Sequence, residues 1–395
     1  MARADVIAGV SQAAFVLNYN GGGTNHVVQK NGTTDTFYMV FVDAASDLVY
    51  TKTTDGGFTW SVPTVVRTGT LVAHAVWYDR WTGLSTDKIR IAYVDNNDIF
   101  YRDLDISSDT LGTETTVFDG TSSAAGGALS IVAGRDGRIA VAGSIDAGAE
   151  DGAWSSTDDG ATWGDTIADP SEGATQDQYY LLPGWNADTA DLMLIFVDAS
   201  ANGLSVKRYD DSANSWAETA IIADGSFVDA VPGGSFPHVG CFVDVTNSRN
   251  VIMGWSAVDT LNADLRAFVI VDTSVTETTA NAVLNSTDDQ GLVAACLDTG
   301  TATWYAIYTG KSDGSETFST ATKVYYKTTT DGGATWSAET ALSNSVRSTA
   351  FLYGTPRFGT NFLAMFGNDM STGDNILVSV NIPTGGSANL LAGKL

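Results

Sequence analysis

The chain contains three histidines, His26, His74 and His238, and each stands at or near the start of a short apolar run. Imidazole ligates divalent metals and, because its pKa lies near neutrality, can act as an acid or a base. Comparable runs farther along the chain carry other polar residues at this position: Gln178, Tyr179 and Arg347. If these runs are equivalent strands, all these side chains share one face, where we predict that a ligand binds.

Two interpretations of the histidines stay open. They ligate a divalent cation, which is the one cofactor that the sequence suggests, with His26, His74 and His238 as the candidate metal ligands. Alternatively, each hydrogen-bonds a neighbouring loop and is structural. Turns beginning at Asp43 and Asp95 add carboxylates to the same face, where they either cap their own turns or bind cations. No catalytic residue is assigned.

Three segments repeat the pattern Ser/Thr-x-Asp-x-Gly-x-Thr-Trp. Their Asp, Gly and Trp residues are Asp55, Gly57 and Trp60; Asp158, Gly160 and Trp163; and Asp331, Gly333 and Trp336. A fourth, degenerate copy has Asp211 and Trp216, with Ala213 in place of the glycine. We expect the Asp to accept N–H bonds within its turn, the Gly to adopt a backbone conformation that other residues resist, and the Trp to anchor the turn.

This pattern resembles the Asp-box, or BNR, repeat of sialidase-like β-propellers. The resemblance implies that the repeats are structural turns between the third and fourth strands of propeller blades, on the face opposite the ligand site. It therefore implies that ligands bind where the first strands begin, which is the face predicted to hold His26, Gln178 and Arg347.

The spacing of the repeats predicts the number of blades. The copies at Asp158 and Asp211 lie 53 residues apart (211 − 158), and the interval from Asp55 to Asp158 is about twice that. Seven hairpin patterns follow this spacing, each preceded by one more strand. The sequence thus predicts an all-β fold, a seven-bladed β-propeller of four-stranded antiparallel blades in residues 23–395. A six-bladed, sialidase-type ring is the alternative, and residues 1–22 form either an arm or a ring-closing strand.

The same resemblance argues against sialidase activity. Sialidases bind a carboxylate with three arginines, use a Tyr–Glu pair as the nucleophile and an Asp as the acid, and place the first arginine in an Arg-Ile-Pro motif. This chain has no such motif. Arg135 and Arg138 fall in a turn on the opposite face, so only Arg347 lies at a predicted ligand position. None of the seven glutamates stands beside a suitably placed tyrosine.

Composition limits the partners. The chain has 46 acidic and 20 basic residues, a net charge of −26, so its surface repels nucleic acids and anionic lipids. We expect no membrane insertion, because no apolar run is long enough to span a bilayer. The acidity either attracts cationic partners or adapts the protein to a salty medium. Cys241 and Cys296 lie in apolar runs and are predicted to be free, buried thiols.

These observations predict a non-catalytic recognition or structural propeller. It would bind a glycan or protein receptor, or the neighbouring subunits of an assembly, as part of a virion or an extracellular surface without a classical signal peptide; a cytoplasmic location is the alternative. The alternative function is a carbohydrate-active enzyme, a glycoside hydrolase or polysaccharide lyase, with a His-lined mouth. By residue type, His26, His74, Gln178 and His238 are similar to the metal-binding set of seven-bladed oligogalacturonate lyases, although the surrounding motifs differ.

Overall fold

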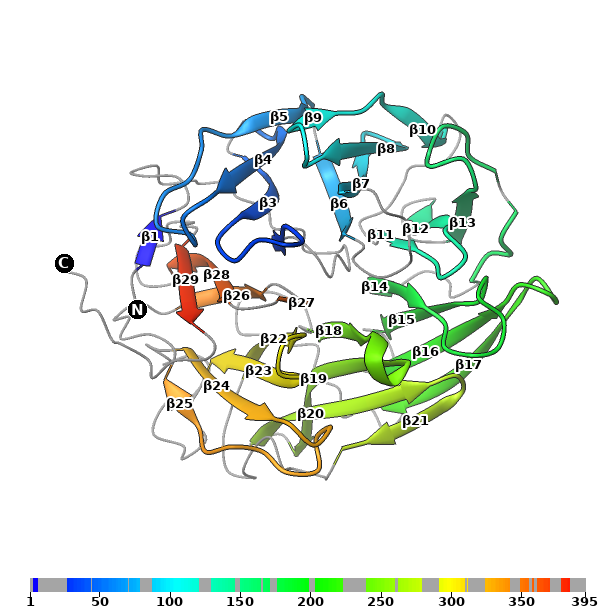
Figure 1. The fold of residues 1–395 in the computed structure, drawn as a ribbon. Helices are drawn as coiled ribbons and strands as arrows, with labels where there is room; N and C mark the ends of the chain where they lie inside the picture. The colour runs from blue at the N-terminus through cyan, green and yellow to red at the C-terminus, as the bar shows by residue number, and fades with distance from the viewer. Residues whose placement is uncertain are drawn as a thin grey trace.

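The computed structural model consists of short β-strands joined by turns and arranged in a ring (Figure 1). The structure describes residues 3–5, 27–43, 45–69, 71–78, 87–120, 129–145, 150–164, 166–170, 176–198, 203–222, 239–259, 262–278, 291–309, 311, 324–341, 349–354, 357–358, 361–369 and 378–383. Within these residues the strands form seven separate sheets.

Six of the sheets take their antiparallel strands from one continuous stretch of chain each, and we name them blades 1 to 6 in chain order. Blade 1 contains β2 (Val27–Gln29), β3 (Phe37–Val42), β4 (Leu48–Thr53) and β5 (Thr64–Arg67). Blade 2 contains β6 (Leu71–Tyr78), β7 (Lys88–Asp95), β8 (Asp98–Asp105), β9 (Thr110–Leu111) and β10 (Thr115–Phe118). Blade 3 contains β11 (Leu129–Ala133), β12 (Ile139–Ile145) and β13 (Glu150–Ser156).

The second half of the chain continues this arrangement. Blade 4 contains β14 (Gln176–Pro183), β15 (Leu192–Asp198), β16 (Gly203–Asp210) and β17 (Ser215–Ile222). Blade 5 contains β18 (Val239–Asp244), β19 (Arg249–Asp259), β20 (Asn262–Val271) and β21 (Ser274–Glu277), with the short 3-10 helix η2 (Val245–Asn247) between β18 and β19. Blade 6 contains β22 (Gly291–Asp298), β23 (Thr303–Thr309), β24 (Val324–Thr329) and β25 (Thr340–Ala341).

The seventh sheet, which we call the closing sheet, joins the two ends of the described chain. Its strands are β26 (Thr349–Gly354), β28 (Asn361–Asp369), β29 (Val378–Pro383) and β1 (Arg3–Asp5), in the order β1-β29-β28-β26. Between β26 and β28, the two-residue strand β27 (Arg357–Phe358) instead pairs in parallel with β22 of blade 6.

The predicted all-β propeller of small, mostly four-stranded antiparallel blades is confirmed. The six single-stretch blades match the six-bladed alternative, and the closing sheet is the further unit that the repeat spacing counted as a seventh. The sequence could not separate the two counts, because whether a last hairpin forms its own sheet depends on a strand from the other end of the chain.

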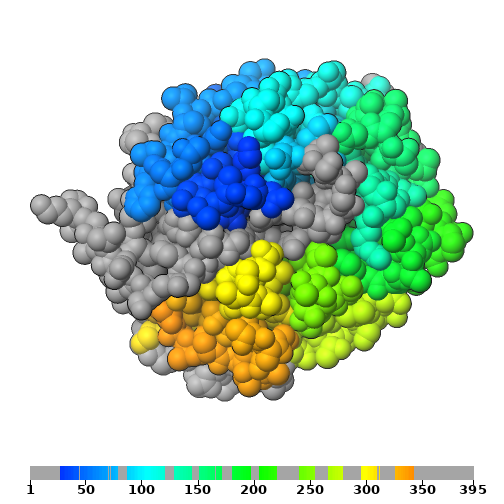
Figure 2. Space-filling view, in the orientation of Figure 1, coloured from blue at the N-terminus to red at the C-terminus, as the bar shows by residue number. Residues whose placement is uncertain are grey.

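Each blade begins near the centre of the ring and ends at its rim. Figure 1 shows β14, β18 and β22 near the centre, and β17, β21 and β25 toward the outside. The first strands of neighbouring blades contact one another, as in the pairs β6 and β11, β11 and β14, and β18 and β22. The space-filling view shows the blades following one another around the molecule in chain order (Figure 2).

The core lies between the blades, so each blade buries both of its faces. Alternate residues of a strand point to opposite faces: Ala75 and Trp77 of β6 pack in a cluster shared with blades 3 to 5, whereas Val76 and Tyr78 pack against blade 1. Burial on both faces explains why strands such as Phe37–Val42 are apolar without alternation.

Two further predictions concern the cysteines and membranes. Cys241 and Cys296 are free and buried, as predicted, and burial raises the pKa of both thiols. Among the described residues, no helix has the length and apolarity needed to cross a membrane.

Candidate functional site

The three repeat turns, residues 53–60, 156–163 and 329–336, are built by hydrogen bonds to their Asp. Asp55 Oδ1 accepts the backbone N–H groups of Phe58 (3.0 Å) and Thr59 (2.9 Å), and its Oδ2 accepts the Thr59 hydroxyl (2.6 Å). Thr53 donates to Asp55 and accepts the N–H of Gly57. Asp158 and Asp331 bond in the same way to Thr162 and Thr335, and these bonds lower the pKa of both carboxyls to about 2.

The glycine of each repeat turn has the backbone conformation that the pattern predicts. Gly57, Gly160 and Gly333 have φ values of 89°, 87° and 93°, in the left-handed region that favours glycine. Gly160 is also pressed against blade 2, because a Cβ at this position would lie 2.1 Å from Cε1 of Tyr101. The expected conformation is therefore reinforced by a close contact that the sequence alone did not reveal.

The tryptophan of the second repeat turn anchors it to the preceding blade. The Trp163 ring lies 5.2 Å from the Tyr101 ring, centroid to centroid, and its Nε1 donates to Thr115 Oγ1 (3.1 Å). Thr115 in turn donates to the backbone oxygen of Gly160 (2.8 Å). The turn of blade 3 is therefore fixed to blade 2 by aromatic packing and hydrogen bonds.

The degenerate copy in blade 4 requires a correction. We predicted that Asp211 would cap this turn, but Asp210 accepts the N–H of Ala213 (3.1 Å), while Asp211 pairs with Arg138 of blade 3. The missing glycine is replaced by Asn214, which has φ 46°. Trp216 keeps the expected anchoring role, because its Nε1 donates to the oxygen of Ala168 at the end of blade 3 (2.6 Å).

A more general feature links these turns. We call the turn that follows the third strand of a blade its outer turn. In blades 2 to 5, an Asp of the outer turn forms an ion pair with a cation of the preceding blade. The pairs are Asp109 with Lys52 (2.7 Å), Asp159 with Lys88 (2.6 Å) and Arg90 (2.9 Å), Asp211 with Arg138 (2.6 Å), and Asp272 with Arg208 (2.8 Å, without hydrogen-bond geometry).

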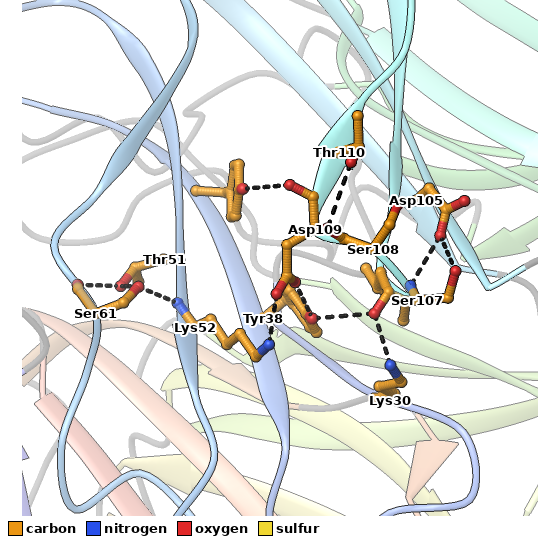
Figure 3. Close-up of polar contacts among 12 residues, drawn as sticks. Lys30, Tyr38, Thr51, Lys52, Ser61, Asp105, Ser107, Ser108, Asp109 and Thr110 are labelled. Carbon is orange, nitrogen blue, oxygen red and sulfur yellow. Dashed lines mark hydrogen bonds and ion pairs between the residues drawn. The ribbon is translucent and has the colours of Figure 1, made fainter.

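Figure 3 shows this contact between blades 1 and 2. Asp109 accepts hydrogen bonds from Lys52 Nζ (2.7 Å) and from the Tyr38 hydroxyl (2.5 Å), both of blade 1. Lys30 Nζ, also from blade 1, donates to the backbone oxygen of Ile106 (2.6 Å). The outer turn of blade 2 has no Asp-box pattern, yet it docks on the preceding blade as the repeat turns do.

Sequence reasoning missed these cations. Arg90 is 1% exposed, and neither its Nε nor its Nη1 has a hydrogen-bond partner in the structure. A charged residue so deeply buried needs a counter-ion, and Asp159 supplies it from the next blade. Lys88 and Arg90 in a mostly apolar strand indicated that a counter-ion was needed. The sequence could not show that this counter-ion is Asp159, because Asp159 belongs to another blade.

The structure contains two tyrosine–glutamate pairs that the sequence did not reveal. Tyr93 donates to Glu114, and Tyr308 donates to Glu339 Oε2 (2.7 Å). Burial, with the neighbouring glutamate, raises the pKa of both phenols. Glu114 is also paired with Arg67 of blade 1 (2.6 Å), so this pair is part of a contact between blades.

His74 does not lie at the mouth of the ring, as predicted, but within the contact between blades 1 and 2. Strand β6 begins three residues earlier, at Leu71, so His74 is inside the strand. It is fully buried and hydrogen-bonds the backbone of Val40 in blade 1; burial lowers its pKa to about 4. The prediction that it binds a ligand or metal from solvent does not fit this position.

The other predicted ligand residues are less fully described. Gln178 and Tyr179 lie in β14, the first strand of blade 4, paired with Val197 and Phe196 of β15, and their side chains are outside the described part of the structure. His26, His238 and Arg347 also lie outside the described residues. His74 does not take part in a convergence of the three histidines at the mouth. That His26 and His238 converge there stays a prediction.

The carboxylates on the predicted ligand face cap turns or pair with cations. Asp43 Oδ1 accepts the N–H groups of Ala45 (2.8 Å) and Asp47 (3.0 Å), and Asp95 pairs with Arg67 (2.7 Å). Among the described residues, no group of three or more His, Cys, Asp or Glu side chains could hold a metal ion. These turns were predicted either to be capped by their Asp or to bind cations. The hydrogen bonds of Asp43 agree with capping.

Comparisons with known proteins agree with the propeller fold. No family model and no curated protein matches the sequence. Among solved structures, an ulvan lyase of polysaccharide lyase family PL25, bound to -[GlcA(1-4)Rha3S]-, is similar at a TM-score of 0.54 and 10% identity, over 94% of this chain and 96% of the lyase. The Hadza microbial sialidase Hz136 is similar at a TM-score of 0.51 and 12% identity, over 91% of this chain and 65% of the sialidase. At these identities the likeness concerns the fold alone: this chain has a β-propeller fold.

The contact at Gly160 predicts the effect of adding one methyl group. Gly160→Ala should lower the free energy of unfolding by about 1–3 kcal/mol more than Gly32→Ala, because its Cβ overlaps Tyr101 as well as requiring a positive φ. Gly32 is the matched control, since it has φ 73° and no atom within 4 Å of an added Cβ. Urea unfolding of both variants measures the difference, and equal losses would show that the turn does not press on blade 2.

The burial of His74 predicts a pH dependence of stability. Its pKa is about 4 in the folded protein and about 6.5 when unfolded, so the unfolded chain binds more protons between these values. Stability is full above pH 6.5 and falls by about 1.4 kcal/mol per pH unit as the pH drops from 6.5 toward 4.

The variant His74→Gln tests this prediction, because glutamine keeps a hydrogen-bond donor but does not titrate. Urea unfolding at several pH values between 4.5 and 7.5 should show that the wild type loses more stability than the variant on acidification. Parallel curves for the two proteins would contradict the position of His74 described above.

Proposed function

We propose that this chain is an Asp-box propeller that recognises glycans without transforming them, as part of a virion or an extracellular surface. The three repeat turns support the Asp-box assignment, because their Asp, Thr and Gly residues make the internal hydrogen bonds that the pattern predicts. The propeller fold is one that carbohydrate-active proteins use, among them the ulvan lyase and the sialidase compared above.

The observation that carries the non-catalytic part of the proposal is the position of the reactive groups. In the described residues, His74 lies buried between blades 1 and 2, and Tyr93 bonds Glu114, which joins the same contact through Arg67. Tyr308 is buried and bonds Glu339 within blade 6, and Arg138 is bound to Asp211 of the next blade. These groups already have partners within or between blades, and a substrate would have to break those contacts.

The ligand would bind on the face where the first strands begin, away from the outer turns. The described residues place Gln178 and Tyr179 near the start of β14, the first strand of blade 4. A tyrosine ring and an amide are side chains that suit a sugar, since the ring packs against C–H groups and the amide bonds hydroxyls. These two residues are therefore the first to test.

A glycan array with the purified protein tests the proposal. We expect binding to a defined set of glycans, and a loss of affinity of about tenfold or more in Gln178→Ala and Tyr179→Ala. Ser108→Ala, an exposed position in the outer turn of blade 2, is the control and should bind as the wild type does.

The same glycans should remain intact after prolonged incubation with the protein. Release of reducing ends would indicate a hydrolase, and ultraviolet absorbance from unsaturated uronic acid would indicate a lyase. Either product, if lost in Tyr179→Ala, would contradict the non-catalytic proposal and favour the alternative of a carbohydrate-active enzyme. Absence of glycan binding would contradict the recognition function itself.

A further inference from the structure

The closing sheet differs from the blades in how its outer strands are connected. In blades 1, 2, 4, 5 and 6, the third strand leads into the fourth through the outer turn. In the closing sheet, the third strand is β29 and the fourth is β1, which lie at opposite ends of the described chain. These two strands are therefore connected only through the whole propeller, and no outer turn joins them.

Because the closing sheet has no outer turn, it contacts blade 6 in a different way. In blades 2 to 5 the outer turn docks on the preceding blade, but no outer turn joins β29 to β1 in the closing sheet. A different contact takes its place, because β27 pairs in parallel with β22, with Leu297 opposite Arg357 and Asp298 opposite Phe358. The closing sheet is thus tied to blade 6 by backbone pairing near the centre of the ring.

The outermost strand of the closing sheet is very short. Strand β1 has three residues, and it pairs with β29 through Arg3 and Val380, Ala4 and Ser379, and Asp5 and Val378. Three residue pairs form few hydrogen bonds, and each contributes about 0.5–1.5 kcal/mol net. When β1 leaves, the edge of β29 presents unpaired N–H and C=O groups, which accept another extended strand.

We propose that the edge of β29 is an exchangeable strand-acceptor site, and that its second occupant is β1 of another copy of this chain. Exchange replaces each backbone pair by an identical one, so it costs little free energy. Residues 6–26, which connect β1 to β2 of blade 1, span at most about 70 Å at about 3.3 Å per residue. That reach exceeds the radius of gyration expected for a chain of this size, about 21 Å.

Charge determines when exchange occurs. Each copy carries a net charge of −26, so two copies repel one another at low ionic strength. Salt screens this repulsion, with a Debye length that falls from about 30 Å at 0.01 M to about 3 Å at 1 M. Strand-exchanged dimers therefore increase with both protein concentration and salt.

A disulfide test detects the exchange directly. Two full-length variants, Ala4→Cys and Ser379→Cys, are mixed, unfolded, refolded together and oxidised, and a disulfide-linked heterodimer forms only where β1 of one copy pairs with β29 of the other. We expect this heterodimer on non-reducing gels, in amounts that rise with protein and salt concentration. The natural thiols of Cys241 and Cys296 are buried and do not interfere in the folded protein.

Two controls make every outcome informative. The double variant Ala4→Cys/Ser379→Cys should form an internal disulfide at low concentration, which shows that the paired positions can be bridged. Ala4→Cys mixed with Thr64→Cys, at the exposed start of β5, should give no more heterodimer than background. An internal disulfide without any heterodimer would overturn the exchange, failure of both would overturn the β1–β29 pairing, and equal cross-linking to Thr64→Cys would show non-specific contact.

Discussion

The docking of an outer turn on the preceding blade is the contact on which the account of this propeller depends. In blades 2 to 5 an Asp of that turn pairs with a Lys or Arg of the blade before it. The chain has only 20 basic residues against 46 acidic ones, yet five of them serve these four contacts. These pairs stand beside other hydrogen bonds between blades, such as Trp163 to Thr115 and Trp216 to the oxygen of Ala168. The Arg138–Asp211 pair is partly buried, so salt screens it less than pairs on the open surface.

This arrangement separates structural polar groups from groups that could act on a ligand. The buried His74, the Tyr93–Glu114 pair and the arginines paired with outer-turn carboxylates lie between blades, whereas the Tyr308–Glu339 pair lies within blade 6. The closing sheet is the exception to the pattern, because it lacks an outer turn and is held instead by β27 and β1. That difference makes it the place where the ring can exchange a strand.

Local and non-local interactions were predictable to different degrees. The repeated Ser/Thr-x-Asp-x-Gly-x-Thr-Trp pattern predicted the conformation of residues 53–60, because Asp55 bonds atoms within four residues of itself. The partners of the turns, such as Tyr101 and Arg138, belong to other blades, and no local pattern reveals them. His74 was misplaced because β6 starts before the apolar run suggested, which turned a supposed mouth residue into a buried one.

The central claim, that outer turns hold the blades in order through Asp–cation pairs, is tested by a double-mutant cycle across blades 3 and 4. Unfolding free energies of the wild type, Arg138→Met, Asp211→Asn and the double variant give the coupling between two groups that lie 2.6 Å apart. We predict a coupling of about 1 kcal/mol or more for this pair, and additivity within about 0.3–0.5 kcal/mol for Arg138→Met combined with Asp272→Asn at the next contact. Additive losses for Arg138 and Asp211 would contradict the account.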